Sequence, residues 1–201
     1  MRSRLLDLDS CRLRGRNSNL LYFFKWQRVI QIRLKVQTLP ELEVVDNVDL
    51  NRYLGKWYEI ASIPAWFQRG CASRTTATYT LNKDGTIGVL NECYDKNGAM
   101  KKAKGRAWVV DKKTNAKLKV SFLSFLGLRL FAADYWIIDL GSDYEYAVVG
   151  HPSRTFGWIL SRNPTLPDVT FDGIVRRLTA KGYDFSKFKM TDQTDSKRAS
   201  Y

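Results

Sequence analysis

Short stretches of alternating apolar and polar residues follow one another from Gly55 almost to the end of this 201-residue chain. Such alternation places successive side chains on opposite faces of a β-strand. Turn-forming pairs such as Asp84-Gly85 separate the stretches and supply the positive φ of tight hairpins. The pattern predicts strands over residues 55–62, 74–81, 86–94, 102–110, 116–122, 134–140, 144–150 and 156–162.

Strands joined mainly as simple hairpins are typical of an all-β fold, either an up-and-down barrel or a sandwich. Closing eight antiparallel strands into a barrel removes exposed sheet edges and leaves room inside for one small ligand. Residues 169–181 have helical periodicity, with one apolar face that includes Ile174 and Leu178. We expect this helix to pack on the outside of the barrel, and a last short strand over residues 183–185.

The charge is uneven along the chain. Residues 1–36 hold nine basic and two acidic side chains, a large share of the net charge of +13. The apolar run over residues 20–24 is too short to span a bilayer, and no small-residue cleavage site follows it. We expect three parts: a basic extension over 1–39 that is poorly ordered or acts in targeting, a barrel with its helix over 40–190, and a polar tail over 191–201. A dispensable segment, a transit peptide and a segment lying on anionic lipid all fit the extension.

Few residues in the chain are suited to catalysis or metal binding. Three widely spaced cysteines and a single histidine exclude a dense disulfide scaffold and a multi-histidine metal site. His151 lies in a predicted turn, where a solvated histidine is favoured over a catalytic one. Cys71 and Cys93 fall at the same end of two neighbouring predicted strands. They either form a disulfide, which would require an oxidising compartment, or remain two separate thiols. We expect no catalytic residues, no metal and no cofactor.

Three motifs resemble the signatures of the lipocalin family, in the family's order and spacing. They are Gly-Lys-Trp-Tyr-Glu-Ile-Ala over 55–61, Ala-Asp-Tyr-Trp-Ile-Ile over 133–138 and Trp-Ile-Leu-Ser-Arg over 158–162. Within the family, the chain is most similar to the bacterial outer-membrane lipocalins, plant temperature-induced lipocalins and apolipoprotein D. The resemblance implies an eight-stranded antiparallel up-and-down β-barrel with a C-terminal α-helix outside it. It also implies that Trp57, beside Gly55, closes the barrel floor and that Arg162 lies across its ring in a cation–π contact.

The expected site is the barrel interior near its open end. We expect binding, transport or storage of one small hydrophobic ligand, such as a fatty acid, lysophospholipid or sterol, by a monomer or weak dimer. Glu59 shares the face of Trp57, so its carboxyl group must be paired, solvated at one end of the barrel, or protonated. The candidate ligand-binding residues are Glu59, Ala61, Phe67, Tyr79, Phe122, Tyr135, Tyr146 and Trp158.

An apolar loop is predicted over residues 122–131. For an exposed apolar loop beside a barrel mouth, we favour contact with a membrane. We therefore expect a peripheral protein of an outer or plasma membrane, or alternatively a secreted protein. Alternatively, the loop folds over the mouth of the barrel or packs against the N-terminal segment. The predicted membrane-contact residues are Phe125, Leu126, Leu128, Leu130 and Phe131.

Two other functions compete with ligand binding. The first is an enzyme on the same barrel, either an isomerase with Cys71 as its thiol or an epoxide-processing enzyme with acidic residues. No paired carboxylates at a recognisable spacing support it. The second is nucleic-acid binding by residues 1–36, which contain no recognition module. We expect no nucleic-acid partner.

Overall fold

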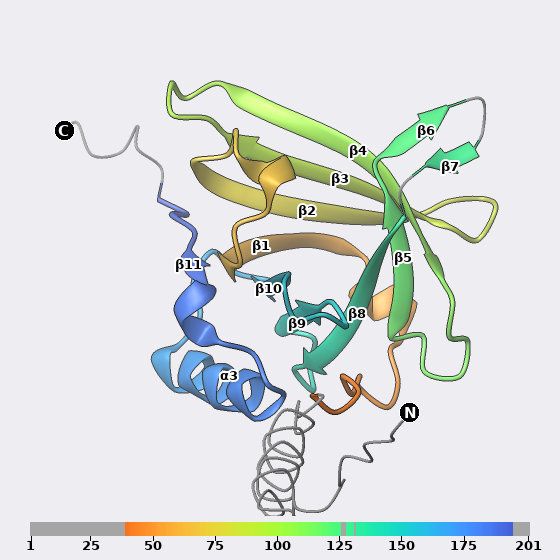
Figure 1. Ribbon diagram of the computed structural model, residues 1–201. Coiled ribbons are helices and arrows are strands. Elements are labelled where there is room, and N and C mark those ends of the chain that lie inside the picture. The colour runs from red at the N-terminus through yellow and green to blue at the C-terminus, as the bar shows by residue number, and fades with distance from the viewer. Residues whose placement is uncertain (1–38, 126–127, 131, 195–201) are drawn as a thin grey trace, which may run out of the picture. The chain divides into compact units, whose positions relative to one another are not determined.

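The structure is a computed structural model, which describes residues 39–125, 128–130 and 132–194 (Figure 1). Contacts within the chain separate Met1–Pro40 from a second unit that begins at Glu41. The predictions for residues 1–38 and 195–201 lie outside the described residues, so the proposed division into extension, barrel and tail stays a prediction.

An antiparallel sheet of eight strands closes on itself through pairing of its first and last members, β1 and β10. This confirms the predicted barrel, and the ends of the strands differ only slightly from the predicted ones. Each strand pairs with its neighbour along the chain, as expected for an up-and-down topology. The strands are β1 Gly55–Ser62, β2 Ser73–Leu81, β3 Ile87–Tyr94, β4 Met100–Val109, β5 Lys117–Ser121, β8 Ala133–Leu140, β9 Tyr146–Gly150 and β10 Gly157–Ser161.

Short elements connect and extend the barrel. The helix α2 (Leu50–Tyr53) precedes β1, and Asp49 caps it by accepting hydrogen bonds from two backbone amides. A 3₁₀ turn, η1 (Trp66–Gln68), lies in the long connection between β1 and β2. The predicted loop over 122–131 instead contains two short strands, β6 (Leu123–Phe125) and β7 (Leu128–Leu130), which pair as a separate hairpin (Figure 1).

The last strand is not where the sequence pattern placed it. Tyr183 is buried, and its hydroxyl group lies within hydrogen-bond distance of the backbone of His151 and Phe156 in the β9–β10 connection. The chain then forms a 3₁₀ turn, η2 (Phe185–Lys187), before β11 (Lys189–Met190) pairs with Ala61 and Ser62. The prediction of a strand over 183–185 was therefore wrong, because Tyr183 is an anchor and pairing begins only beyond η2.

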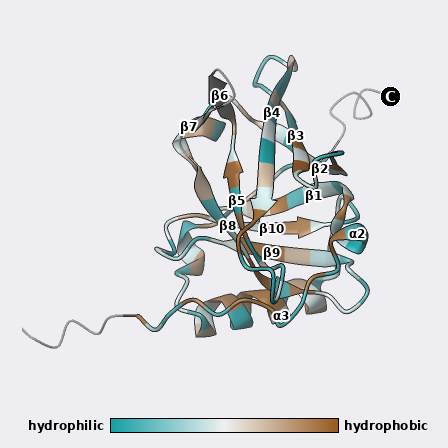
Figure 2. Ribbon diagram, turned by 90° about the vertical axis from the view of Figure 1, so that its right-hand side faces the viewer, coloured by the Kyte–Doolittle hydropathy of each residue, from teal (hydrophilic) through white to brown (hydrophobic). Residues whose placement is uncertain are grey.

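Two apolar clusters lie on opposite sides of the barrel wall. The inner cluster includes Trp57, Tyr79 and Leu160. The outer cluster includes Ile159 and packs under the helix α3 (Asp168–Ala180), which contributes Ile174 and Leu178. Figure 2 shows α3 outside the strands, next to β9. The expected position of this helix is thus confirmed, and the inner cluster lies in the barrel interior, where the sequence placed the candidate site.

Candidate functional site: the barrel interior

The floor of the barrel is formed by Trp57 and Arg162. The guanidinium carbon of Arg162 lies 3.7 Å from the centroid of the Trp57 ring, and the Trp57 side chain is fully buried. Arg162 also donates hydrogen bonds to the carbonyl oxygens of Arg52, at 2.6 Å, and Lys56, at 3.0 Å. Gly55 has a φ of 93°, and a side chain there would approach the Arg162 guanidinium group. The structure therefore brings together the three residues that the resemblance assigned to the floor.

Three tyrosine hydroxyl groups meet in the interior above the floor. The Tyr135 hydroxyl oxygen lies 2.8 Å from that of Tyr53 and 2.9 Å from that of Tyr79. Burial raises the pKa of Tyr79 to about 12 and raises the pKa values of Tyr53 and Tyr135 well above the usual range. All three are therefore neutral phenols at physiological pH, able to donate and accept hydrogen bonds.

Tyr53 was missed as a site residue because α2 lies outside the strand pattern used to choose the candidates. One available signal was its spacing, four residues before Trp57. The Trp57 indole nitrogen donates a hydrogen bond of 2.8 Å to the Tyr53 carbonyl oxygen, and the two rings lie 5.1 Å apart.

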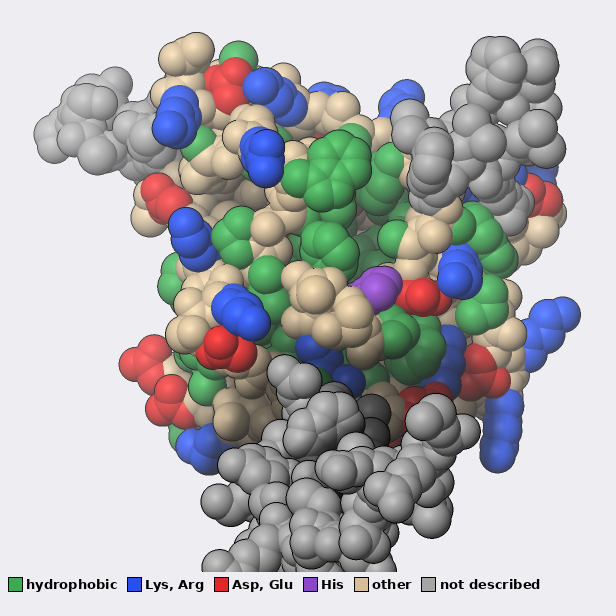
Figure 3. Space-filling model, viewed as in Figure 1, with side chains coloured by type: hydrophobic (Ala, Val, Ile, Leu, Met, Phe, Trp, Pro, Cys, Tyr) green, Lys and Arg blue, Asp and Glu red, His purple; other side chains and the backbone are tan. Residues whose placement is uncertain are grey.

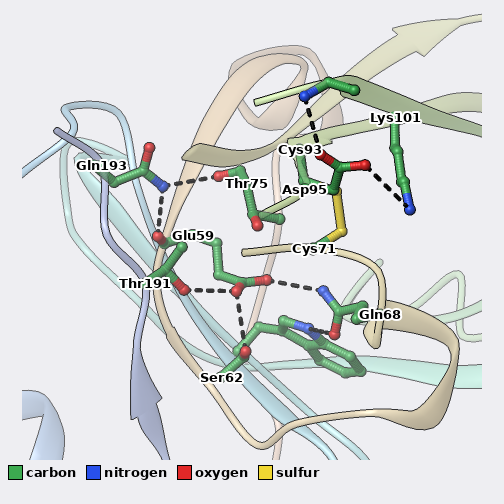
Figure 4. Close-up of a disulfide and its surroundings, with 12 residues drawn as sticks. Glu59, Ser62, Gln68, Cys71, Thr75, Cys93, Asp95, Lys101, Thr191 and Gln193 are labelled. Carbon is green, nitrogen blue, oxygen red and sulfur yellow. Dashed lines mark hydrogen bonds and ion pairs between the residues drawn. A yellow bond between two sulfur atoms is a disulfide. The ribbon is translucent and has the colours of Figure 1, made fainter. Parts of the chain in front are cut away.

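Glu59 is buried, with 6% of its surface exposed, and is held by hydrogen bonds. Its carboxylate oxygens accept from the side chains of Ser62 at 3.0 Å, Gln68 at 3.1 Å and Thr191 at 2.7 Å (Figure 4). Of the predicted alternatives, the structure gives a carboxyl group satisfied by neutral donors. The Trp158 indole nitrogen in turn donates to the Gln68 side-chain oxygen at 3.3 Å, so Gln68 links Glu59 to the interior face of β10.

The last described residues close the gap where β1 and β2 separate. Pairing between these strands ends at Tyr58 and Thr76. Beyond that point the Gln193 side-chain amide donates to the carbonyl oxygens of Glu59, at 2.7 Å, and Thr75, at 2.9 Å (Figure 4). Neither Gln193 nor Thr191 was predicted as a site residue, because strand parity says nothing about a tail segment.

Two predicted ligand-binding residues lie outside the interior. The register of β1 against β10 shifts between Glu59 and Ala61, so Ala61 turns to the outer cluster under α3. Tyr146 belongs to the same outer cluster, and its hydroxyl group accepts a hydrogen bond of 2.8 Å from Arg177 of α3. Its neighbour Ala147 faces the interior instead. Parity counted along an unbroken strand was therefore wrong for Ala61, whereas β9 alternates without a break and Tyr146 lies on its outer face.

The other aromatic candidates are distributed between the interior and the mouth. Tyr79, Tyr135 and Trp158 belong to or pack against the inner cluster. Phe67 lies in the β1–β2 connection and is 51% exposed. Its ring centroid is 6.2 Å from that of Phe156, which stacks on Trp158. These rings form a continuous aromatic path, and Figure 3 shows hydrophobic side chains gathered in the middle of the molecular face, with charged residues around them.

Phe122 lies beside β4 and remains partly exposed. A side chain at Gly105 would come within 2.8 Å of the Phe122 ring, so the ring covers this glycine. Phe122 is 38% exposed. Leu126 and Phe131 lie outside the described residues, whereas Phe125, Leu128 and Leu130 lie on the paired backbone of the β6–β7 hairpin.

Cys71 and Cys93 form a disulfide whose Cα atoms are 5.5 Å apart (Figure 4). The bond joins the β1–β2 connection to the end of β3. The isomerase alternative needs a free thiol at Cys71, and the disulfide removes it.

His151 is engaged within its own turn. Its Nδ1 atom accepts a hydrogen bond of 3.1 Å from the Ser153 backbone amide and lies 2.7 Å from the Ser153 hydroxyl oxygen. This is the arrangement of a turn-stabilising side chain. Within the part of the chain that the structure describes, no three His, Cys, Asp or Glu side chains gather as metal ligands, and no helix has the length and apolar character needed to cross a bilayer.

A family model described as "Lipocalin-like domain" matches residues 48–193. The chain is 44% identical over 159 residues to temperature-induced lipocalin-1 of Arabidopsis thaliana, covering 78% of this chain and 85% of the relative. It is 40% identical over 154 residues to the outer membrane lipoprotein Blc of Escherichia coli K12, covering 76% and 84%. It is 37% identical over 164 residues to apolipoprotein D of Mus musculus, covering 78% and 82%.

Solved structures support the same fold. Insecticyanin from the tobacco hornworm Manduca sexta superposes with a TM-score of 0.64 at 22% identity, covering 79% of this chain and 88% of that one. Apocrustacyanin C2 gives a TM-score of 0.59 at 19% identity, covering 74% and 81%.

Proposed function

The chain belongs to the lipocalin family, which binds small hydrophobic ligands, and we propose that it carries or stores one lipid molecule inside its barrel. The observation that carries this proposal is the inner cluster, which is apolar and is closed at one end by Trp57 and Arg162. A lipid chain would enter from the other end, along the aromatic path of Phe67, Phe156 and Trp158. Burial of its surface would supply about 25 cal/mol per Å² before the cost of association.

We further propose that the protein works at a membrane surface. Trp66 and Phe67 are 71% and 51% exposed, and such large apolar side chains are suited to the interfacial region of a bilayer. The sequence of the β6–β7 hairpin contributes Phe125, Leu128 and Leu130. One relative is named an outer membrane lipoprotein and another a temperature-induced lipocalin, which supports a role in membrane maintenance or stress protection.

Lipid extraction from the purified full-length protein, followed by mass spectrometry, tests the binding proposal. Ala107 is 4% exposed and belongs to the inner cluster, so Ala107→Trp should fill the interior and abolish co-purification of lipid. Ala180→Trp, at the exposed end of α3, is the matched control and should retain the wild-type amount. Equal lipid content in all three proteins would contradict the proposal.

Liposome flotation tests the membrane proposal separately. Phe125→Asp together with Leu128→Asp should prevent binding to vesicles of mixed phosphatidylcholine and phosphatidylglycerol, because charged side chains are costly to bury in a bilayer. Lys112→Asp alone, in the exposed β4–β5 turn, changes the net charge by the same amount as the two hairpin substitutions and controls for it. Binding that survives the hairpin substitutions would remove this surface from the proposal.

A further inference from the structure

Asn91 carries a polar group in the barrel interior. On β3 it lies two residues beyond Val89, which belongs to the inner cluster, and it shares the face of that residue. Its cross-strand neighbours are Ala77 on β2 and Ala103 on β4, in stretches of unbroken register. Ala77 in turn pairs with Trp57, so Asn91 belongs to a row of residues that starts at the barrel floor.

The amide oxygen of Asn91 is buried and has no hydrogen-bond partner among the described residues. A buried amide oxygen without a donor is costly, so the group is poised to accept a hydrogen bond from a ligand. Alanine side chains on both neighbouring strands can neither donate this bond nor cover the amide group. An O–H or N–H group on the ligand would satisfy it.

The tyrosine cluster holds one hydrogen that its own hydrogen bonds do not use, and either hydroxyl group of each pair can be the donor. Three hydroxyl groups carry three hydrogens, but only two hydrogen bonds join Tyr53, Tyr135 and Tyr79. When each donates to the next in that order, the remaining hydrogen belongs to Tyr79. Tyr79 pairs with Val89, which makes it a diagonal neighbour of Asn91 on the same face, at a typical separation of about 7–8 Å between backbones.

Glu59 disfavours a second negative charge in this part of the barrel. Its carboxylate is held by Ser62, Gln68 and Thr191, none of which carries a positive charge. Burial is the main cause of the raised pKa of Tyr79; the hydrogen bond with Tyr135 lowers this pKa and Glu59 raises it. An ionised fatty acid placed beside Tyr79 would be repelled, and it would have no hydrogen to give to Asn91.

We propose that the barrel selects a neutral lipid with a hydroxyl group, whose oxygen accepts from Tyr79 and whose hydrogen is donated to the Asn91 amide oxygen. This rests on the proposed function and specifies its ligand class: a long-chain alcohol or another hydroxyl-bearing neutral lipid, in preference to an ionised fatty acid.

Three probes of equal chain length test the proposal: tetradecanol, its methyl ether and tetradecanoate. Each is titrated into delipidated full-length protein at about pH 8, where a carboxylic acid is ionised, with tryptophan fluorescence as the readout. Tetradecanol should bind about tenfold more tightly than its methyl ether, which keeps the oxygen but lacks the hydrogen for Asn91, and more tightly than tetradecanoate.

The matched variants locate the effect. Asn91→Leu keeps the approximate volume and removes the amide group, so it should weaken tetradecanol binding about tenfold and make the alcohol and its ether bind alike. Asn97→Ala, in the exposed β3–β4 turn, should leave all three affinities unchanged. If Asn91→Leu does not fold, the comparison of alcohol with ether in the wild type still decides the question.

The outcomes separate this inference from the proposed function. Equal binding of alcohol and ether, or tighter binding of tetradecanoate, overturns the hydroxyl preference and leaves lipid binding intact. Failure of all three probes to bind overturns lipid binding itself, and with it the inference.

Discussion

The two ends of the barrel are built in different ways. At the floor, Trp57 is fully buried and is covered by Arg162, the residue that follows the last barrel strand, β10. At the mouth, Trp66 and Phe67 are exposed, and Gln68 and the disulfide tie their connection to the barrel. The floor therefore relies on packing and the mouth on a few discrete links, so substitutions at the two ends should differ in size and in what they affect.

The largest effect is expected at the floor. Trp57→Ala should lower the free energy of unfolding by about 3–5 kcal/mol, because it removes a buried indole and leaves Arg162 without its aromatic partner. Urea denaturation monitored by circular dichroism measures this. Trp66→Ala, at the mouth, is the control and should cost less than about 0.5 kcal/mol. Similar losses for the two variants would contradict the contrast between the ends.

High pH should lower the stability of the barrel through the tyrosine cluster near the floor. The folded-state pKa of Tyr79 is raised to about 12, above the unfolded value. The contribution of neutral Tyr79 to the free energy of unfolding is therefore fully present below about pH 10 and is lost as the pH rises toward 12. The loss should amount to about 3 kcal/mol. Urea midpoints across this range give the stability, and absorbance at the tyrosinate band gives the ionisation.

Tyr79→Phe supplies the comparison for that experiment. Its stability should fall less steeply between about pH 10 and 12 than that of the wild type, because one buried phenol no longer titrates. Identical slopes in the two proteins would show that the tyrosine is not the source of the loss.

The disulfide tests one link at the mouth. The double variant Cys71→Ser with Cys93→Ser opens a loop with a sequence separation of 22 residues. It should lower the free energy of unfolding by about 3 kcal/mol, mainly because the unfolded chain gains conformational entropy without the cross-link. Alkylation with and without reductant, followed by mass spectrometry, checks the bond in the wild type. Labelling of Cys71 without reductant would argue against it.

The smallest effect is expected for Gln68→Ala. The substitution removes one hydrogen-bond donor to Glu59 and the acceptor for the Trp158 indole. It should lower the free energy of unfolding by about 1 kcal/mol. Proteolysis within residues 63–72 should become faster, and the unfolding midpoint should fall by much less than in Trp57→Ala. Arg69→Ala, an exposed neighbour, is the control. A loss as large as that of Trp57→Ala would mean that the mouth is not a separate, weakly tied region.

The sequence predicted the barrel and its floor because both depend on regular patterns. Alternation identified the eight strands, and the motifs containing Trp57 and Arg162 identified the floor. The bulge after Glu59 left no mark in the alternation, so the orientation of Ala61 could not be predicted. The partners of Glu59 could not be predicted either, because Gln68 and Thr191 come from a connection and a tail that approach it only after folding.

Asn91 could have been placed inward by parity from Val89, but no sequence pattern indicates that its amide oxygen lacks a partner among the described residues. That property depends on the side chains across the interior and not on β3 itself. Tyr53 was similarly hidden, since its contact with Tyr135 joins positions 82 residues apart in the chain.

The position of β1 also has a consequence for the order of synthesis. Its residues Tyr58 to Ser62 pair with β10, and β11 pairs with Ala61 and Ser62, so partners of the first strand are made only after most of the chain. A growing polypeptide on the ribosome would hold β1 to β9 as an open sheet whose two edges, β1 and β9, still lack β10. The barrel can close only after β10 has been synthesised, and until then its apolar lining would be open to chaperones or to a nearby membrane.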